Sequence, residues 1–159
     1  MRAAVLTVSD GVAAGERADE SGDLLEELLS EAGYDVLRRV VADDHGAIAT
    51  ALRELAADRG LVLTTGGTGL APRDVTPEAT REVVQREAPG IAEALRADST
   101  ARTPHGLLSR GVAGTIGAAL VVNLPGSPGG CRDGWRVLEP ALPHALGLLS
   151  KQTTPHLQT

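Results

Sequence analysis

The stretch Leu61–Gly69, which reads LVLTTGGTG, combines a strand with a glycine loop. Its first five residues are apolar or β-branched and predict a buried strand, and the glycine-rich segment follows directly. Ligands of open α/β sheets bind at the carboxyl ends of strands, where glycines let backbone N–H groups and threonine hydroxyls approach a phosphate. Glycine clusters are equally typical of plain tight turns. The position after a strand favours the phosphate interpretation.

The residues before this stretch alternate between strand and helix patterns. Apolar, β-rich runs at Ala3–Val8 and Val36–Val41 predict two more strands. Each is followed by apolar residues at helical spacing, first over Leu24–Ala32 and then over Ile48–Leu55. This order is typical of parallel βαβ units with right-handed crossovers, so the sequence predicts the α/β class.

A helix is expected shortly after the glycine loop. Thr76 is a candidate N-cap, and the helix should run from Pro77 to about Glu87, because proline suits the first helical position. Pro89-Gly90 should stop this helix, and the next one should begin at Ile91.

The last third of the chain predicts two strands and a closing helix. The strands are expected at Val112–Thr115 and Ala118–Leu124. Leucines over Leu138–Leu149 predict the helix, which Pro140 and Pro143 should kink or split.

Length and composition indicate a single globular domain. The chain has 159 residues, of which 42% are hydrophobic and 23% charged, and its mean hydropathy is −0.02. We expect one domain over residues 1–150 and a polar tail over residues 151–159. The single cysteine, Cys131, allows neither an internal disulfide nor a cysteine-rich zinc site, which favours a reducing, cytoplasmic compartment.

Charge and residue content disfavour several functions. A net charge of −6 argues against nucleic acid as a partner, and no apolar run approaches the length of a membrane span. Lys151 is the only lysine, so there is no P-loop lysine. The four histidines show no metal-ligand spacing and Cys131 has no histidine beside it, so surface roles are expected for them.

Carboxylates near the predicted strand ends are candidate metal ligands. Asp74 follows the glycine loop, and Asp43 follows the second strand. Carboxylates beside a phosphate loop suit Mg²⁺, although Asp74 would also fit an Asx turn. Asp44 is a candidate helix cap, and spacing alone does not rank it against Asp43. Arg110 offers a fork for phosphate, but a surface ion pair is the more typical role of a single arginine.

Short motifs occur in order along nearly the whole chain. They are Thr7–Asp10, Thr64–Gly69, Arg73–Ala79, Pro89-Gly90, Glu93, Arg96, Thr103-Pro104, Leu108–Arg110, Ala113-Gly114 and Leu124–Pro128. Together they resemble the MogA/MoaB family of molybdenum cofactor biosynthesis proteins. An ordered series of this kind is far more specific than one glycine motif. The sequence departs from many members at Gly129-Gly130, where they carry a lysine or a small polar residue.

The resemblance implies a fold, an activity and partners. The fold would be a three-layer α/β/α molybdopterin-binding fold with a mostly parallel sheet, in a homotrimer. The activity would be molybdopterin adenylyltransferase, with ATP and molybdopterin as substrates, Mg²⁺ as cofactor and pyrophosphate as a product. A molybdenum-insertion enzyme of the same pathway would be a further partner.

The resemblance also implies a site. Asp43 rather than Asp44 matches the family's first essential aspartate, and Asp74 matches the second; both would be catalytic and would bind the metal. The substrate-binding residues would be Ser9, Asp10, Thr65, Gly66, Gly67, Thr68, Gly69, Ser109, Arg110, Gly126 and Ser127.

Two alternatives to the enzyme stay open. A non-catalytic molybdopterin-binding or carrier protein would keep the pocket without adenylyl transfer, although it would not require both aspartates. A related domain acting on another nucleotide or cofactor, as in competence-damage-inducible proteins, usually comes attached to a further domain.

Overall fold

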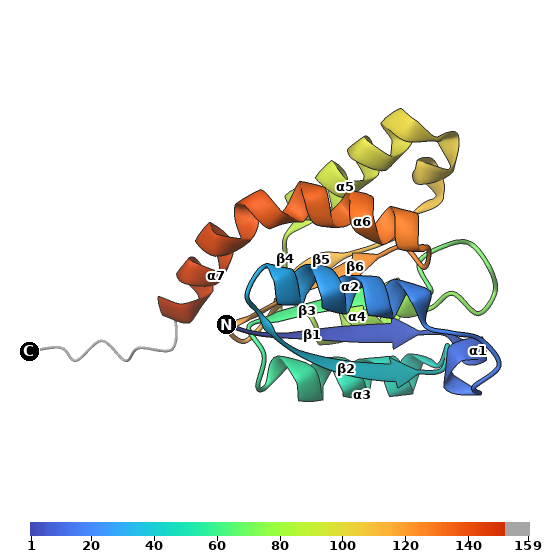
Figure 1. Cartoon of the computed structure of the whole chain (residues 1–159), viewed down its shortest axis with the longest axis horizontal. Coiled ribbons are helices and arrows are strands. Elements are labelled where there is room, and N and C mark those ends of the chain that lie inside the picture. The colour runs from blue at the N-terminus through green and yellow to red at the C-terminus, as the bar shows by residue number, and fades with distance from the viewer. Residues whose placement is uncertain (152–159) are drawn as a thin grey trace, which may run out of the picture.

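The computed structural model describes residues 1–151 of the chain. Within them, six strands form one sheet in the order β2-β1-β3-β6-β5-β4 (Figure 1). Strands β2, β1, β3 and β6 are parallel, whereas β5 pairs antiparallel with both β6 and β4. The strands span Arg2–Val8 (β1), Asp35–Val41 (β2), Leu61–Thr65 (β3), Arg86–Glu87 (β4), Ala113–Ile116 (β5) and Ala119–Leu124 (β6). The mostly parallel α/β sheet is thereby confirmed.

Helices cover both faces of this sheet. Ala3 and Val5 of β1 pack into one apolar cluster with α2, α6 and α7, whereas Ala4 and Leu6 pack into a second cluster with α3 and α4. Figure 1 shows α2 and α6 above the sheet and α3 below it. The helices span Asp10–Ala13 (α1), Glu20–Glu31 (α2), His45–Ala56 (α3), Thr76–Val83 (α4), Pro89–Arg102 (α5), Pro104–Leu108 (η1), Pro128–Leu138 (α6), Glu139–Ala141 (η2) and Leu142–Ser150 (α7). A strand that is apolar on both faces is typical of a sheet between two helical layers, and the three-layer fold is confirmed.

Polar caps fix the starts of the two helices that follow β1 and β2. The Asp19 carboxylate accepts from the Gly22 N–H at 3.1 Å at the start of α2. The Asp44 carboxylate accepts from the Ala47 N–H at 2.8 Å at the start of α3. Each bond satisfies an N–H group that the helix itself leaves unpaired. The side chain of Asp44 is therefore used as a cap.

The helix expected over residues 77–87 is shorter than predicted. It ends at Val83, because the next residues pair with β5: the Gln85 N–H donates to the Thr115 carbonyl at 2.8 Å, and residues 86–87 form β4. Thr76 does not cap this helix; its hydroxyl donates to the Gly66 carbonyl instead. Sheet pairing and loop contacts thus override the local helix pattern.

Prolines begin helices here more often than they end them. Pro89 is the first residue of α5 rather than a stop, and Pro128 starts α6, a helix whose beginning the sequence pattern did not indicate. The predicted split of the closing helix is confirmed, since η2 separates α6 from α7 at Pro140. The surface role expected for Cys131 is wrong, because α6 carries it into the core.

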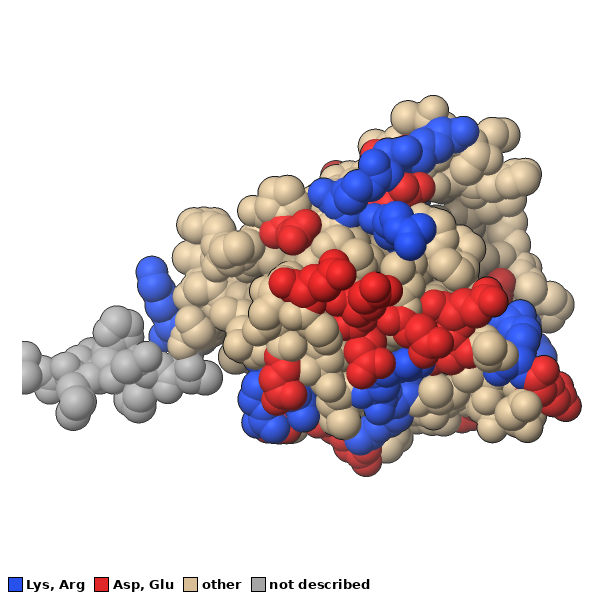
Figure 2. Space-filling model, in the orientation of Figure 1, with Lys and Arg blue, Asp and Glu red and all other residues tan. Residues whose placement is uncertain are grey.

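No helix in residues 1–151 is both long and apolar enough to cross a membrane. Apart from Lys151, the predicted polar tail lies outside the described residues. Acidic side chains gather over α2 and basic side chains over the upper helices α5 and α6 (Figure 2).

Candidate functional site

The glycine loop is a fixed turn at the carboxyl end of β3. Gly66 and Gly67 have φ angles of 100° and 70°, which side-chain-bearing residues rarely adopt. A Cβ on Gly66 would lie 2.2 Å from the Val8 carbonyl oxygen, so the loop backbone lies directly against β1. On its other side, the Thr76 hydroxyl donates to the Gly66 carbonyl at 2.9 Å. The first turn of α4 thereby holds the loop in place.

Two cavities adjoin this loop. The first cavity, about 330 Å³, lies between the end of β1 and the start of α2. The second cavity, about 390 Å³, lies between the loop, η1 and the start of α6. Of the predicted binding residues, the first cavity is lined by Ser9, Thr65, Gly66 and Gly126, and the second by Thr68, Gly69, Ser109 and Ser127. A Cβ on Gly126 would lie 3.4 Å from the Gly66 Cα, so the loop after β6 closes against the glycine loop.

The two predicted metal ligands also border the loop. A Cβ on Gly67 would lie 3.3 Å from Asp43 Oδ1, and a Cβ on Gly69 would lie 2.9 Å from Asp74 Oδ2. Asp43 Oδ2 accepts from the Asp10 N–H at 2.9 Å, and Asp74 Oδ2 accepts from the Ala71 N–H at 3.0 Å. Within residues 1–151, the other oxygen of each carboxylate accepts no hydrogen bond. Each aspartate thus keeps one oxygen for a ligand.

These donors fit Mg²⁺ better than a metal held by protein alone. The described residues include no cluster of three or more His, Cys, Asp and Glu side chains suited to a metal. Mg²⁺ is commonly bound through one or two carboxylates together with substrate phosphates, and it keeps several waters. Asp43 and Asp74, which border the glycine loop, could supply the carboxylates of such a site.

Arg110 holds the far end of the glycine loop. Its Nε donates to the Gly69 carbonyl at 2.8 Å and its Nη2 to the Asp74 carbonyl at 2.7 Å. Its third nitrogen forms an ion pair with Glu78, and this bond lowers the pKa of the Glu78 carboxyl. Arg110 therefore contacts loop carbonyls and a carboxylate, and it is absent from the lining of both cavities.

Asp10, Gly67 and the two predicted metal ligands, Asp43 and Asp74, likewise lie outside the lining of both cavities. Asp10 instead contacts Arg73, a residue to which sequence analysis gave no role. The Arg73 Nε and Nη2 donate to the Asp10 carboxylate at 2.6 and 3.0 Å, and this pairing lowers the pKa of Asp10. The only signal in the sequence is that Arg73 directly precedes Asp74.

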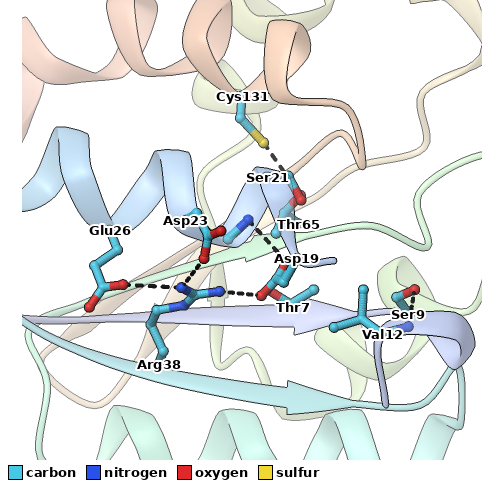
Figure 3. Close-up of polar contacts among 11 residues, drawn as sticks. Thr7, Ser9, Val12, Asp19, Ser21, Asp23, Glu26, Arg38, Thr65 and Cys131 are labelled. Atoms are coloured by element: carbon cyan, nitrogen blue, oxygen red, sulfur yellow. Dashed lines mark hydrogen bonds and ion pairs between the residues drawn. The ribbon is translucent and has the colours of Figure 1, made fainter. Parts of the chain in front are cut away.

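A second carboxylate network is centred on Asp19 (Figure 3), and its members Thr7 and Asp19 line the first cavity. Asp19 Oδ2 accepts from the Thr7 hydroxyl at 2.8 Å and from Arg38, while Oδ1 caps α2 through Gly22. Arg38 also pairs with Asp23 and, at 3.1 Å, with Glu26. These partners are scattered along β1, α2 and β2, so only the fold brings them together.

Cys131 of α6 is buried beside Thr65, which lines the first cavity, and its thiol is unreactive. Its thiol donates to the Pro125 carbonyl at 3.2 Å and lies 3.3 Å from the Thr65 hydroxyl (Figure 3). Burial raises the pKa of the Cys131 thiol to about 11. A thiol with that pKa stays protonated near neutral pH, which makes it a poor nucleophile.

The fold and the site define a class of protein: a three-layer α/β protein with a glycine loop after β3 and two carboxylates, Asp43 and Asp74, that border this loop. The family described as "Probable molybdopterin binding domain" matches residues 4–144. The chain therefore belongs to this family, whose members include the MogA and MoaB proteins of molybdenum cofactor biosynthesis.

Individual proteins similar to this chain are also proteins of molybdenum cofactor biosynthesis. Molybdopterin adenylyltransferase of Helicobacter pylori is 39% identical over 150 residues, which cover 91% of this chain and 85% of that protein. The MoaB enzyme of Thermus thermophilus has 46% identity and a TM-score of 0.88, with 94% of this chain and 96% of that chain covered. The molybdenum cofactor synthesis protein cinnamon of Drosophila melanogaster is 39% identical over 149 residues, 91% of this chain, but the match spans only 25% of its length.

Proposed function

We propose that the chain is a molybdopterin adenylyltransferase, which transfers AMP from MgATP to the phosphate of molybdopterin and releases pyrophosphate. One observation carries this proposal: Asp43 and Asp74 border the same glycine loop, and each keeps one carboxylate oxygen without a hydrogen bond among the described residues. A protein that only binds molybdopterin has no need of two such carboxylates. Two cavities beside one loop also suit two substrates that both carry phosphate.

The reaction demands positioning more than proton transfer. A phosphate oxygen of molybdopterin attacks the α-phosphorus of ATP, and the bond from that phosphorus to the oxygen bridging the β-phosphate breaks. Because the attacking group is already an anion, no strong base is required. The loop from Gly66 to Gly69 binds phosphate oxygens, and Asp43 and Asp74 hold the metal. Mg²⁺, when bound, neutralises charge on the phosphate oxygens and on the departing pyrophosphate.

The proposal extends to the assembly, the location and the partner of the enzyme. A homotrimer, a cytoplasmic location and hand-over of the product to a molybdenum-insertion enzyme are expected because they accompany this activity in the family.

The test is anaerobic incubation of the purified protein with molybdopterin, ATP and Mg²⁺, with adenylyl-molybdopterin and pyrophosphate as readouts. Native protein and the Asp43→Asn variant are compared with Asp44→Asn, a matched control in which the neighbouring carboxylate changes but asparagine still caps α3. We expect the native rate from Asp44→Asn and a loss of about a hundredfold or more from Asp43→Asn. Molybdopterin binding without pyrophosphate from the native protein would instead support the carrier function.

A further inference from the structure

The segments that carry the two proposed metal ligands are joined by a clamp, which we define as Asp10 and Arg73. Asp10 and Asp43 exchange hydrogen bonds: the Asp10 N–H donates to Asp43 Oδ2 at 2.9 Å, and the Asp43 N–H donates to Asp10 Oδ1 at 3.0 Å. This reciprocal pair ties the corner after β1 to the corner after β2. It also fixes which oxygen of Asp43 remains without a hydrogen bond.

Arg73 joins a third segment to that pair. Its guanidinium donates twice to the Asp10 carboxylate, at 2.6 and 3.0 Å, and its Nη2 also donates to the Asp43 carbonyl at 3.2 Å. Arg73 directly precedes Asp74 in the loop between β3 and α4. The guanidinium that donates to the Asp10 carboxylate and to the Asp43 carbonyl therefore also restricts the position of the Asp74 backbone.

The chemistry of the pair suits this positioning role. A bidentate arginine–carboxylate bond fixes the orientation of both groups as well as their distance. Asp10 also places a negative charge beside Asp43. The positive charge of Arg73 balances it and so reduces the repulsion between the two neighbouring carboxylates. On the opposite side of Asp74, Arg110 holds the Asp74 carbonyl at 2.7 Å, so the backbone there is fixed from two directions.

We infer that the clamp of Asp10 and Arg73 sets the spacing of the Asp43 and Asp74 carboxylates and thereby determines how tightly the divalent metal binds. Both are positioning residues rather than catalytic residues. The inference rests on the proposed function, because it takes Asp43 and Asp74 as the metal ligands. It gives Asp10 a different task from the substrate contact that the family resemblance implies.

The test measures metal binding directly and by kinetics. Mn²⁺ is titrated by water-proton relaxation, alone and with ATP to supply the phosphate ligands, into native protein and into Arg73→Gln, Arg73→Lys and Arg39→Gln. Arg39→Gln is the matched control, because Arg39 also pairs with one surface carboxylate, that of Glu54, and lies in the strand that leads to Asp43. The Mg²⁺ dependence of adenylyl transfer is then measured for each variant, together with its KM for molybdopterin and its Tm.

We expect Arg73→Gln to weaken Mn²⁺ binding by about tenfold or more and to raise the half-saturating Mg²⁺ concentration by a similar factor. Excess Mg²⁺ should restore kcat, and the KM for molybdopterin should stay within about twofold of the native value. Arg73→Lys, which keeps the charge but loses the fork, should lie between native and Arg73→Gln, while Arg39→Gln should match the native protein. Asp10→Asn should behave like Arg73→Gln, and the double variant should be no worse than either, since both remove the same clamp.

Unchanged Mn²⁺ affinity and Mg²⁺ dependence in Arg73→Gln would overturn the inference. So would a raised KM with a rate that excess Mg²⁺ does not restore, because that pattern indicates direct contact between Arg73 and substrate. Asp43→Asn separates this failure from that of the proposed function. If Asp43→Asn weakens metal binding and Arg73→Gln does not, only the clamp is wrong; if Asp43→Asn also has no effect, the proposed metal site is wrong.

Discussion

The carboxylates on the two sides of the glycine loop differ in how fully they are used. Asp19 fills both oxygens, with the cap of α2 on one and with Thr7 and Arg38 on the other, and its side chain is only 10% exposed. Asp43 and Asp74 each accept one backbone hydrogen bond and leave the second oxygen without one in the described structure. Asp19 therefore serves the fold, whereas Asp43 and Asp74 combine an oxygen without a hydrogen bond with a position beside the glycine loop, as a ligand-binding carboxylate requires.

The largest effect should come from substitution of a carboxylate that keeps one oxygen without a hydrogen bond. Asp74→Asn should lower adenylyl transfer by about a hundredfold or more while the Tm stays close to native, since an amide can keep the bond from Ala71 but binds Mg²⁺ poorly. Turnover of the variant and its thermal melt are measured together. Near-native turnover in a folded variant would remove Asp74 from the proposed role.

Asp19, whose two oxygens both accept hydrogen bonds, should show the opposite pattern, in which substitution lowers stability. Asp19→Ala should lower the free energy of unfolding by about 2–3 kcal/mol, because it removes a helix cap and leaves the mostly buried Arg38 without its least exposed partner. Urea unfolding measures the change. If stability stayed native while activity was lost, Asp19 would belong with the ligand-binding carboxylates and the comparison would fail.

Two helical glycines, one beside the Asp19 network and one in open space, test the structural role of Asp19 further. A Cβ on Gly22 of α2 would lie 2.2 Å from Asp19 Oδ2 and 2.6 Å from the Arg38 guanidinium, whereas nothing lies within 4 Å of a Cβ on Gly147 of α7. Gly22→Ala should therefore destabilise the protein by about 1–2 kcal/mol, against the helix propensity of alanine, and Gly147→Ala should stabilise it by about 0.5–1 kcal/mol. Equal shifts in the urea midpoints of the two variants would show that the Asp19 network does not depend on Gly22.

The smallest expected effect is a pH dependence at Glu78. Arg110 lowers the pKa of Glu78 in the folded protein, so the stability that this pair contributes is present above the ordinary carboxyl pKa and is lost as the pH falls through the lowered value. Glu78→Gln should cost less than about 1 kcal/mol at neutral pH, since both side chains are partly exposed. Urea unfolding of both proteins at neutral and acid pH should show the difference shrinking in acid. A difference that grew in acid would contradict the assigned sign.

The sequence predicts the regular half of the fold and offers candidate site residues, but it does not predict the contacts between these residues. The patterns of β1 to β3 and of α2 and α3 are local, and the sequence predicts them well. The strands β1 and β3 are apolar on both faces and each helix is apolar on one, whereas β2 is an edge strand with two arginines among its apolar residues. The end of α4 at Val83 was missed because β4 exists only through pairing with β5. Arg73 and Arg38 were missed for a similar reason, since their partners lie 63 residues away at Asp10 and 19 residues away at Asp19.

The proposed function requires the conversion of two substrates at one loop. The most direct measurement is anaerobic reaction of the native protein with equal amounts of molybdopterin and ATP in Mg²⁺, with adenylyl-molybdopterin and pyrophosphate quantified together. Both products should appear in a ratio of one to one, and removal of Mg²⁺ should stop the formation of both. Bound molybdopterin with neither product, in any divalent metal, would contradict the proposed function.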